Sequence, residues 1–384
     1  MIILFENRWW GHHPVWLGII ARYLQLKSYD FVVAYPQGKN CEQHLFDIDS
    51  KKLIAISSIW SPIYNKRSNN KLLNLYYKLK PWFHIRKQIK SIEKIKGKEI
   101  DLVFFGAVDD LLHSIIPTAV ANKLLPIKWT GIYHRPAEIQ ETVHGAIPSK
   151  VASVSKSVFC QKIFTFHENI LHKNSKYEYF PEFSSSPSQI KRTPVSDTLQ
   201  KFAKGRPIIG LTGLLQRHKG IEHFLELVVF CKEYCFALIG TNDLEEGTSE
   251  MKYIKSLLDK YNASSLDNLF THFEYIKEYD SLLNSFDLIW CMYENFPWSS
   301  NTLTKAAMLK KSVIVNKPSL IADRVEKYNL GITVLNNSPL DAFFKINNFF
   351  KNEKILHTGL WDEYLEINSI NKLHKICDSL ITSS

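Results

Sequence analysis

The chain has 384 residues, of which 45% are hydrophobic, 22% charged and 13% aromatic, and this composition excludes a disordered chain. Its 15 glycines and 15 prolines are too few for a collagen-like or proline-rich sequence. The formal net charge of +10 predicts an anionic partner, which is a nucleic acid, a membrane surface or a phosphorylated substrate. A chain of this length is too long for one typical domain.

Short apolar runs alternate with amphipathic stretches through the first half of the chain. The run 2–6 predicts a buried strand, and apolar residues at helical spacing predict a helix over 14–25. Further strands are predicted at 31–35, 101–105, 129–133 and 162–166. This alternation is typical of a parallel sheet with helices on both faces.

The polar stretch 184–206 lacks apolar periodicity and predicts an interdomain linker. After it the alternating pattern restarts, with strands at 207–211, 235–239, 269–273, 288–291 and 312–315 and helices at 220–230, 251–261 and 302–309. The expected domains are therefore 1–183 and 207–345, and a helical segment, 346–384, is expected to pack back on the first. A ligand is expected in the cleft between the domains, at the carboxyl ends of the strands.

The N-terminus and the cysteines predict a cytoplasmic protein. The first residues have neither the basic region nor the apolar length of a signal peptide. No apolar run approaches the roughly 18 residues of a membrane-spanning helix. The 6 cysteines are scattered through the chain, so neither a disulfide framework nor a zinc site is expected.

The segment 213–222 (GLLQRHKGIE) follows a predicted strand and opens a predicted helix. Gly213 allows the backbone to turn close to a ligand, and Arg217 and Lys219 place cations beside a helix N-terminus, where anions are stabilised. The planar guanidinium of Arg217 can bind two phosphate oxygens, whereas Lys219 acts as a point charge. The segment predicts a diphosphate site, and the alternative is a basic solvated loop.

The segment 294–307 (ENFPWSSNTLTKAA) follows the predicted strand 288–291. Ser299, Ser300 and Asn301 are residue types that favour helix N-caps, and Thr302 continues as a helix. Backbone amides left without a cap at this point would again face an anion. The alternative is ordinary helix capping without a ligand.

Together the two motifs resemble the C-terminal nucleotide-sugar domain of GT-B glycosyltransferases, particularly glycosyltransferase family 4, over residues 207 to about 335. The family pattern Gly-x-Leu…Lys-Gly-Ile is found at 213–221, and its final helix, strand and glycine are found at 303–309, 312–315 and Gly331. The resemblance implies an α/β fold of two Rossmann-like domains whose parallel sheets face a central cleft. It also implies a nucleotide-diphosphate sugar as substrate, no cofactor and no metal, with Tyr275 and Ile276 near the base.

The chain departs from the family at two positions. The family commonly carries two glutamates seven residues apart, and Lys305 occupies the place of the second and Pro297 that of the first. Glu294 can replace the first glutamate only with a local insertion. The family often has an arginine where this chain has Leu214, and Arg217 is the candidate to compensate for it.

The stretch 6–14 (ENRWWGHHP) joins the first strand to the first helix and resembles the acceptor-side loop of GT-B enzymes. Gly11 and His13 are its candidate acceptor-binding residues. The stretch also resembles the Gly-His sequence of inverting family 1 enzymes, whose histidine is a general base paired with an aspartate roughly a hundred residues later. His12 is the corresponding base here, with Asp109 or Asp110 as its partner. The alternative is that both histidines are capping or surface residues.

Polar residues follow the predicted strand 129–133. In family 4 enzymes a histidine after such a strand often lies beside the donor sugar, and the resemblance implies this role for His134. Arg135 is a candidate for binding a charged acceptor or a phosphate. The alternative is a loop that binds no ligand.

Residues 51–98 hold 13 Lys or Arg and one acidic residue, so this segment accounts for the whole excess of positive charge. The segment also contains several tryptophan and tyrosine side chains. Cations interleaved with aromatic residues predict peripheral contact with an anionic membrane surface. No nucleic-acid-binding fold accompanies the segment, so nucleic acid is not an expected partner. The alternative is a solvated basic helical face.

The predicted function is a glycosyltransferase that moves a sugar from a nucleotide-diphosphate sugar to a glycan or lipid-linked saccharide acceptor, in bacterial surface polysaccharide assembly. Its predicted location is the cytoplasm or the inner face of the plasma membrane. Catalytic candidates are His134, His12 and Glu294. The family 4 resemblance implies retention, and a base at His12 implies inversion. A nucleotide-sugar epimerase of the same fold and a noncatalytic, membrane-peripheral subunit remain as other classes.

Overall fold

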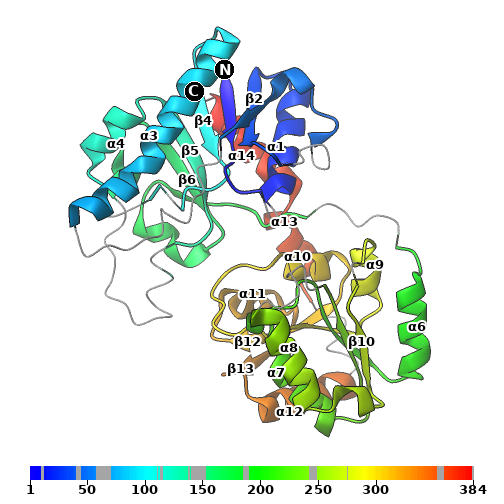
Figure 1. The fold of residues 1–384 in the computed structure, drawn as a ribbon. Coiled ribbons are helices and arrows are strands. Elements are labelled where there is room, and N and C mark those ends of the chain that lie inside the picture. Colours follow the sequence, from blue (N-terminus) through cyan, green and yellow to red (C-terminus); the bar gives the residue numbers. More distant parts are fainter. Residues whose placement is uncertain are drawn as a thin grey trace. The chain divides into compact units, whose positions relative to one another are not determined.

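The computed structural model describes residues 1–9, 13–39, 45–57, 71–109, 111–112, 116–136, 139, 153–184, 190–241, 249–274, 276–352 and 359–382. The described chain divides into two compact units, which Figure 1 shows with their elements labelled. The first unit comprises Met1–Phe180 and Leu373–Ser384, and the second comprises Pro181–Lys372.

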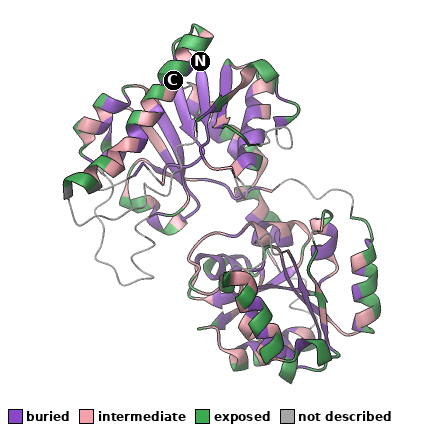
Figure 2. Cartoon of the chain, viewed as in Figure 1, coloured by how far each residue is buried: buried purple, intermediate pink, exposed green. Residues whose placement is uncertain are grey.

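The first unit is built on a seven-stranded parallel sheet in the order β3-β2-β1-β4-β5-β6-β7. Its strands are β1 (Ile2–Phe5), β2 (Phe31–Pro36), β3 (Leu53–Ile56), β4 (Leu102–Phe105), β5 (Lys128–Tyr133), β6 (Cys160–Thr165) and β7 (Tyr177–Tyr179). Every residue of β1 and β4 is buried, as expected for central strands covered on both faces. Figure 2 shows this burial along the strands.

The helices of the first unit are α1 (His13–Leu26), α3 (Lys71–Lys96), α4 (Thr118–Leu124) and α14 (Ile370–Thr382), with 3-10 turns at Ser50–Lys52, Ser153–Lys156 and Glu168–Lys173. Helix α3 buries Trp82, Ile85, Ile89 and Ile92 in the core of this unit. The last helix, α14, packs on α1, where the ring of His374 stacks on Tyr23 at a centroid distance of 3.9 Å.

The second unit is built on a six-stranded parallel sheet in the order β10-β9-β8-β11-β12-β13. Its strands are β8 (Ile208–Thr212), β9 (Cys235–Ile239), β10 (Leu269–His272), β11 (Leu288–Cys291), β12 (Ser312–Lys317) and β13 (Gly331–Leu335). Its helices are α6 (Pro194–Ala203), α7 (Ile221–Phe230), α8 (Ser249–Lys260), α9 (Tyr279–Asn284), α10 (Asn301–Met308), α11 (Leu320–Tyr328), α12 (Pro339–Lys351) and α13 (Trp361–Ile367). Short 3-10 turns lie at Arg217–Lys219 and Ala263–Ser265. Two hydrophobic clusters contain its buried residues.

The prediction of two α/β units with parallel sheets is confirmed, and each strand expected from an apolar run is present within two residues of its expected bounds. Three strands were not expected, namely β3, β7 and β13. All three are edge strands, each with a single neighbouring strand, and β7 is only three residues long. Edge strands and short strands leave a weak sequence pattern.

The structure moves the expected domain boundaries. The range 184–206, expected to be a linker, contains α6, whose Thr193 and Ser196 form a capping box. Leu199 and Ala203 of this helix are buried in the core of the second unit, so α6 is part of that unit. The expected boundary at 345/346 falls inside α12, and the chain returns to the first unit only at Leu373.

Candidate functional site

Two neighbouring strands of the second sheet, β8 and β11, end in the two loops that the sequence singled out. Gly220 lies between the first loop and α7 with a left-handed φ of 67°. A Cβ at this position would lie 2.3 Å from the carbonyl oxygen of Met292, so only glycine allows the loop to pack this closely. The amide of Glu294 donates to the carbonyl of His218 at 2.8 Å, and the two loops are thereby joined.

The ammonium of Lys219 lies at the centre of this arrangement. Its Nζ donates to the hydroxyl of Tyr293 at 3.4 Å and lies 4.8 Å from the centre of that ring. A Cβ on Gly213 would lie 3.7 Å from both the Lys219 Nζ and the Tyr279 hydroxyl, so the glycine leaves this side open. Burial lowers the pKa of Lys219 below 10.5, and within the described residues no carboxylate forms an ion pair with it.

Two phenols lie between Lys219 and the start of α10, the buried Tyr293 and the partly buried Tyr279. The hydroxyl of Tyr293 lies 3.3 Å from Ser300 Oγ. The side chain of Thr302 lies near both hydroxyls and lowers the pKa of each, against the larger effect of burial. Burial raises the pKa of both phenols well above their usual range, so both are neutral and can donate or accept a hydrogen bond.

The N-terminus of α10 has no side-chain cap. Ser300 occupies the N-cap position, and its hydroxyl bonds to Tyr293 instead of the amides of the first turn. The Oδ1 of Asn301 is buried without a hydrogen-bond partner among the described residues. The first amides of a helix without a cap carry a partial positive charge and bind anions. We call the group formed by Gly213, Lys219, Tyr293, Ser300 and the first amides of α10 the Lys219 site.

The structure therefore brings together Gly213, Lys219, Ser300, Asn301 and Thr302 of the predicted donor-binding residues. Three other predicted residues make different contacts. The Arg217 guanidinium lies 4.5 Å from the Tyr253 ring and 3.5 Å from Glu250 on α8. The Ser299 hydroxyl bonds to Glu182 and Arg324, and Ile276 packs against the core of the unit. Tyr275 lies outside the described residues.

Glu294, predicted as catalytic, lies toward α7. Its Oε1 is 3.5 Å from Nε2 of His223, whose Nδ1 lies 3.3 Å from Glu226. Burial raises the pKa of Glu294 above 4.5. At the place of the second family glutamate, Lys305 forms an ion pair of 2.5 Å with Asp280 on α9, a partner that the sequence pattern did not indicate.

The predicted acceptor-side residues follow β1, β4 and β5, three adjacent strands of the first sheet. His13 Nδ1 lies 3.1 Å from Oε2 of Glu6, whose Oε1 accepts from the amide of Arg8 at 2.8 Å. Glu6 is 1% exposed, and a Cβ on Gly106 would lie 2.0 Å from its Oε2. The side chain of Glu6 thus occupies the space left by the missing side chain of Gly106.

The aspartate expected to pair with a histidine has other partners. Asp109 accepts from the backbone amides of His134 and Arg135, at 3.3 and 2.7 Å, and lies 3.9 Å from Arg8. Among the described residues of this loop, Glu6 is the carboxylate that contacts His13, and sequence reasoning did not select it. Gly11, His12 and Asp110, the other predicted members, lie outside the described residues.

His134 lies 4.4 Å from His13, measured between ring centres, and stacks on Trp16 at 5.6 Å. Its Nε2 lies 2.8 Å from the carbonyl of Gly106. Burial, with His13 nearby, lowers the pKa of His134 to about 3, so its ring is neutral near pH 7. Because a carbonyl only accepts, Nε2 carries the proton and Nδ1 is an acceptor. We call Glu6, His13, Asp109 and His134 the histidine cluster.

None of the helices in the described ranges has both the length and the apolar character needed to cross a membrane. The described residues contain no group of three or more His, Cys, Asp and Glu side chains with the arrangement of a metal site.

Solved structures share this architecture over the whole chain. A glycosyltransferase from Rickettsia africae matches at 16% identity and a TM-score of 0.67, over 100% of this chain and 99% of that chain. Sucrose-phosphate synthase from Thermosynechococcus elongatus matches at 12% identity and a TM-score of 0.70, over 100% of both chains. HepE from Anabaena in complex with UDP-glucose matches at 12% identity and a TM-score of 0.68, over 100% of both chains.

At the level of sequence, no family model matches the chain and no characterised protein matches it. The structural likenesses, at these identities, concern the fold. They show that the chain has the GT-B fold, with two Rossmann-like domains each built on a parallel sheet.

Proposed function

We propose that the protein is a glycosyltransferase that transfers a sugar from a nucleotide-diphosphate sugar to an acceptor hydroxyl. The observation that carries this proposal is the Lys219 site. An ammonium group without a carboxylate partner in the described chain lies beside a helix N-terminus without a side-chain cap. A diphosphate supplies the negative charge that both groups lack.

The similar structures support a nucleotide sugar as the donor. HepE from Anabaena is solved in complex with UDP and with UDP-glucose. Sugar transfer from such a donor leaves negative charge on the departing diphosphate. Lys219 and the first amides of α10 would stabilise that charge as it develops, which is usually the largest single contribution to catalysis. In this proposal the protein's own groups neutralise the charge of the departing diphosphate, and no metal is required.

The histidine cluster is the proposed acceptor site. Neutral His134 offers Nδ1 as a hydrogen-bond acceptor for a sugar hydroxyl, and exposed Arg135 offers a cation to a charged acceptor. A glycan or lipid-linked saccharide, used in surface polysaccharide assembly, is the acceptor class that we propose. Its phosphate groups would match the cations of segment 51–98, and the protein would act in the cytoplasm at the inner membrane face.

Retention of the anomeric configuration is the proposed outcome, as the family 4 resemblance implies. Inversion is a second candidate, and the Glu6–His13 contact of 3.1 Å favours it. A carboxylate that holds one imidazole nitrogen fixes the tautomer and the orientation of a histidine base. NMR of the anomeric proton in the first product formed distinguishes the two outcomes.

The proposal is tested by thermal unfolding of the whole chain with UDP, GDP and CMP. A ligand that binds the native state raises the unfolding midpoint, so the correct nucleoside diphosphate should raise it and CMP should raise it less. The corresponding nucleotide sugars are then incubated with saccharide acceptors. Conversion of the donor without any acceptor would indicate an epimerase, and absence of a shift with all three nucleotides would contradict the proposal.

A further inference from the structure

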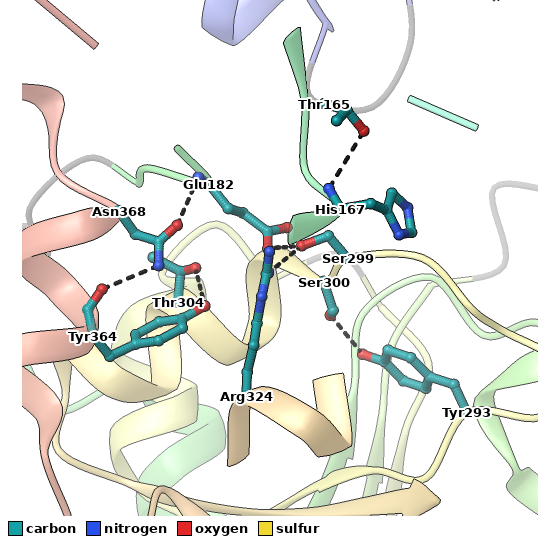
Figure 3. Close-up of polar contacts among 10 residues, drawn as sticks. All are labelled: Thr165, His167, Glu182, Tyr293, Ser299, Ser300, Thr304, Arg324, Tyr364 and Asn368. Atoms are coloured by element: carbon teal, nitrogen blue, oxygen red, sulfur yellow. Dashed lines mark hydrogen bonds and ion pairs between the residues drawn. The ribbon is translucent and has the colours of Figure 1, made fainter. Parts of the chain in front are cut away.

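Ser299, Glu182 and Arg324 form a polar group in the second unit, in which Ser299 is half-buried and the two charged residues are buried (Figure 3). The side chains of Glu182 and Arg324 are 4% and 3% exposed, and Arg324 Nη1 lies 3.0 Å from Glu182 Oε2. The Ser299 hydroxyl donates to the same Oε2 and accepts from the same Nη1 at 2.6 Å. Because a guanidinium only donates and a carboxylate only accepts, the orientation of this hydroxyl is fixed.

The three side chains come from separate parts of the chain. Glu182 lies in the segment just after Pro181, where the second unit begins. Ser299 lies in the loop before α10, 117 residues later, and Arg324 lies on α11. A contact over this separation cannot be a local turn or cap, so it holds the loop to the body of the second unit.

The backbone of Glu182 is held as well. Its amide donates to Oδ1 of Asn368 at 2.8 Å, and Asn368 Nδ2 donates to the carbonyl of Tyr364 at 3.0 Å. The Tyr364 hydroxyl lies 3.1 Å from Oγ1 of Thr304 on α10. These contacts connect Ser299, just before α10, through Glu182 to the end of α13. From α13, Tyr364 contacts Thr304 in the middle of α10, as Figure 3 shows.

The residue next to Ser299 belongs to the Lys219 site. Ser300 has an extended backbone, with φ of −137° and ψ of 117°, and in extended chain neighbouring side chains point to opposite sides. Accordingly, Ser299 contacts Glu182, and Ser300 contacts Tyr293. The Tyr293 hydroxyl accepts a hydrogen bond from Lys219 Nζ. The contacts of Glu182 therefore hold the side of the loop that carries Ser299. The opposite side, which carries Ser300, forms part of the proposed diphosphate site.

We propose that Glu182 is a positioning residue that acts through Ser299 to set the first amides of α10 for the donor diphosphate. Stability alone is a weak reason for this buried ion pair, because well-packed apolar residues often replace such a pair without loss. Its geometric effect is to hold one hydroxyl, and with it one loop, in a single orientation. This inference rests on the proposed function.

The experiment measures UDP affinity by calorimetry and the unfolding midpoint for the whole chain and four variants. Glu182→Gln removes the charge of the carboxylate, and Ser299→Ala removes the hydroxyl while leaving the Glu182–Arg324 pair. The third variant combines both changes. The matched control is Ser338→Ala, which removes the N-cap bond to the Asp341 amide of α12 in the same unit. Its midpoint should fall, and its UDP affinity should stay within about twofold of the wild type.

Each single change should weaken UDP binding about tenfold, the size expected for one hydrogen bond to a charged group. The double variant should bind UDP no more weakly than whichever single variant binds UDP less tightly, because both changes break the same chain of contacts from Glu182 through Ser299 to α10. Effects that add, or single variants that bind UDP like the wild type, would overturn the positioning role and leave the proposed function standing. If Glu182→Gln does not fold, Ser299→Ala alone decides between these outcomes. A wild-type chain that binds neither UDP nor GDP overturns both proposals.

Discussion

The Nζ of Lys219 donates to the hydroxyl of Tyr293 at 3.4 Å, and this contact joins the loops that follow β8 and β11. Tyr293 in turn contacts Ser300, the residue before the first turn of α10. One neutral phenol thereby holds an ammonium group close to a set of free helix amides.

The close packing of Gly220 is the first testable feature. In Gly220→Ala the new Cβ would lie 2.3 Å from the Met292 carbonyl, at a left-handed φ of 67°. The loop must move, so UDP affinity should fall about tenfold or more and the free energy of unfolding should fall by about 1–3 kcal/mol. Gly205→Ala is the matched control, because its φ is 81° and its Cβ would have no atom within 4 Å. Equal UDP affinity of the two variants would contradict the role of the packed loop.

Gly106 provides a test of the histidine cluster. A Cβ there would lie 2.0 Å from Glu6 Oε2, so Gly106→Ala should displace the carboxylate from His13. Loss of an oriented acceptor-side histidine should lower kcat for sugar transfer at least tenfold, with UDP affinity unchanged. Gly97→Ala is the control for a glycine-to-alanine change in the same unit, because its Cβ would have no atom within 4 Å. A Gly106→Ala enzyme with normal kcat would show that the Glu6–His13 contact has no part in transfer.

His134 predicts a dependence of stability on pH. Its pKa is lowered from 6.5 to about 3 in the folded protein. Below pH 6.5 the unfolded chain takes up a proton that the folded chain does not, so this group reduces stability as pH falls from 6.5 toward 3, by up to about 1.4 kcal/mol per pH unit. Urea unfolding at pH 7 and pH 5 should show a smaller loss in His134→Gln, whose amide can still donate to Gly106. An equal loss in both proteins would be incompatible with a His134 that stays neutral in the folded chain.

The exposed lysines on α3 predict binding to anionic membranes. Lys87, Lys90 and Lys94 are exposed, and changing all three to Glu should greatly reduce sedimentation with vesicles that contain anionic lipid. Each basic residue near such a surface contributes about 1 kcal/mol, or about fivefold in partitioning. A matched control changes exposed Lys201, Lys252 and Lys255 of the second unit to Glu. Equal losses in both triple variants, or no binding by the wild type, would refute a specific membrane role for α3.

Much of the fold could be predicted from the sequence because its central strands are continuous apolar runs, such as β1 and β4. The bounds of helix α3 were not predicted, since Pro81 lies inside it and its fully buried apolar residues begin only at Trp82. The Lys219 site was predicted in part, because Gly213, Lys219 and Ser300 lie in loops that follow predicted strands.

Other contacts have no sequence signal. The bond between Glu182 and Ser299 joins residues 117 positions apart, and nothing in the segment around Pro181 indicates a partner. The family 1 resemblance gave Asp109 or Asp110 as the partner of His12, and in the structure Asp109 accepts from the backbone amides of His134 and Arg135. The contact of Glu6 with His13 was not predicted, because it depends on the space that Gly106 on the neighbouring strand end leaves for the Glu6 side chain.

The most direct test of the account is calorimetric titration of UDP and GDP into the wild-type chain and into Lys219→Met, which keeps the length of the side chain and removes its charge. Lys232→Met, an exposed lysine of the same unit, is the control. We predict that the wild type and the control bind one of the nucleotides, and that Lys219→Met binds it about a hundredfold more weakly with an unchanged fold by circular dichroism. Absence of binding to the wild type, or equal affinity in Lys219→Met, would contradict the assignment of the Lys219 site to the donor diphosphate.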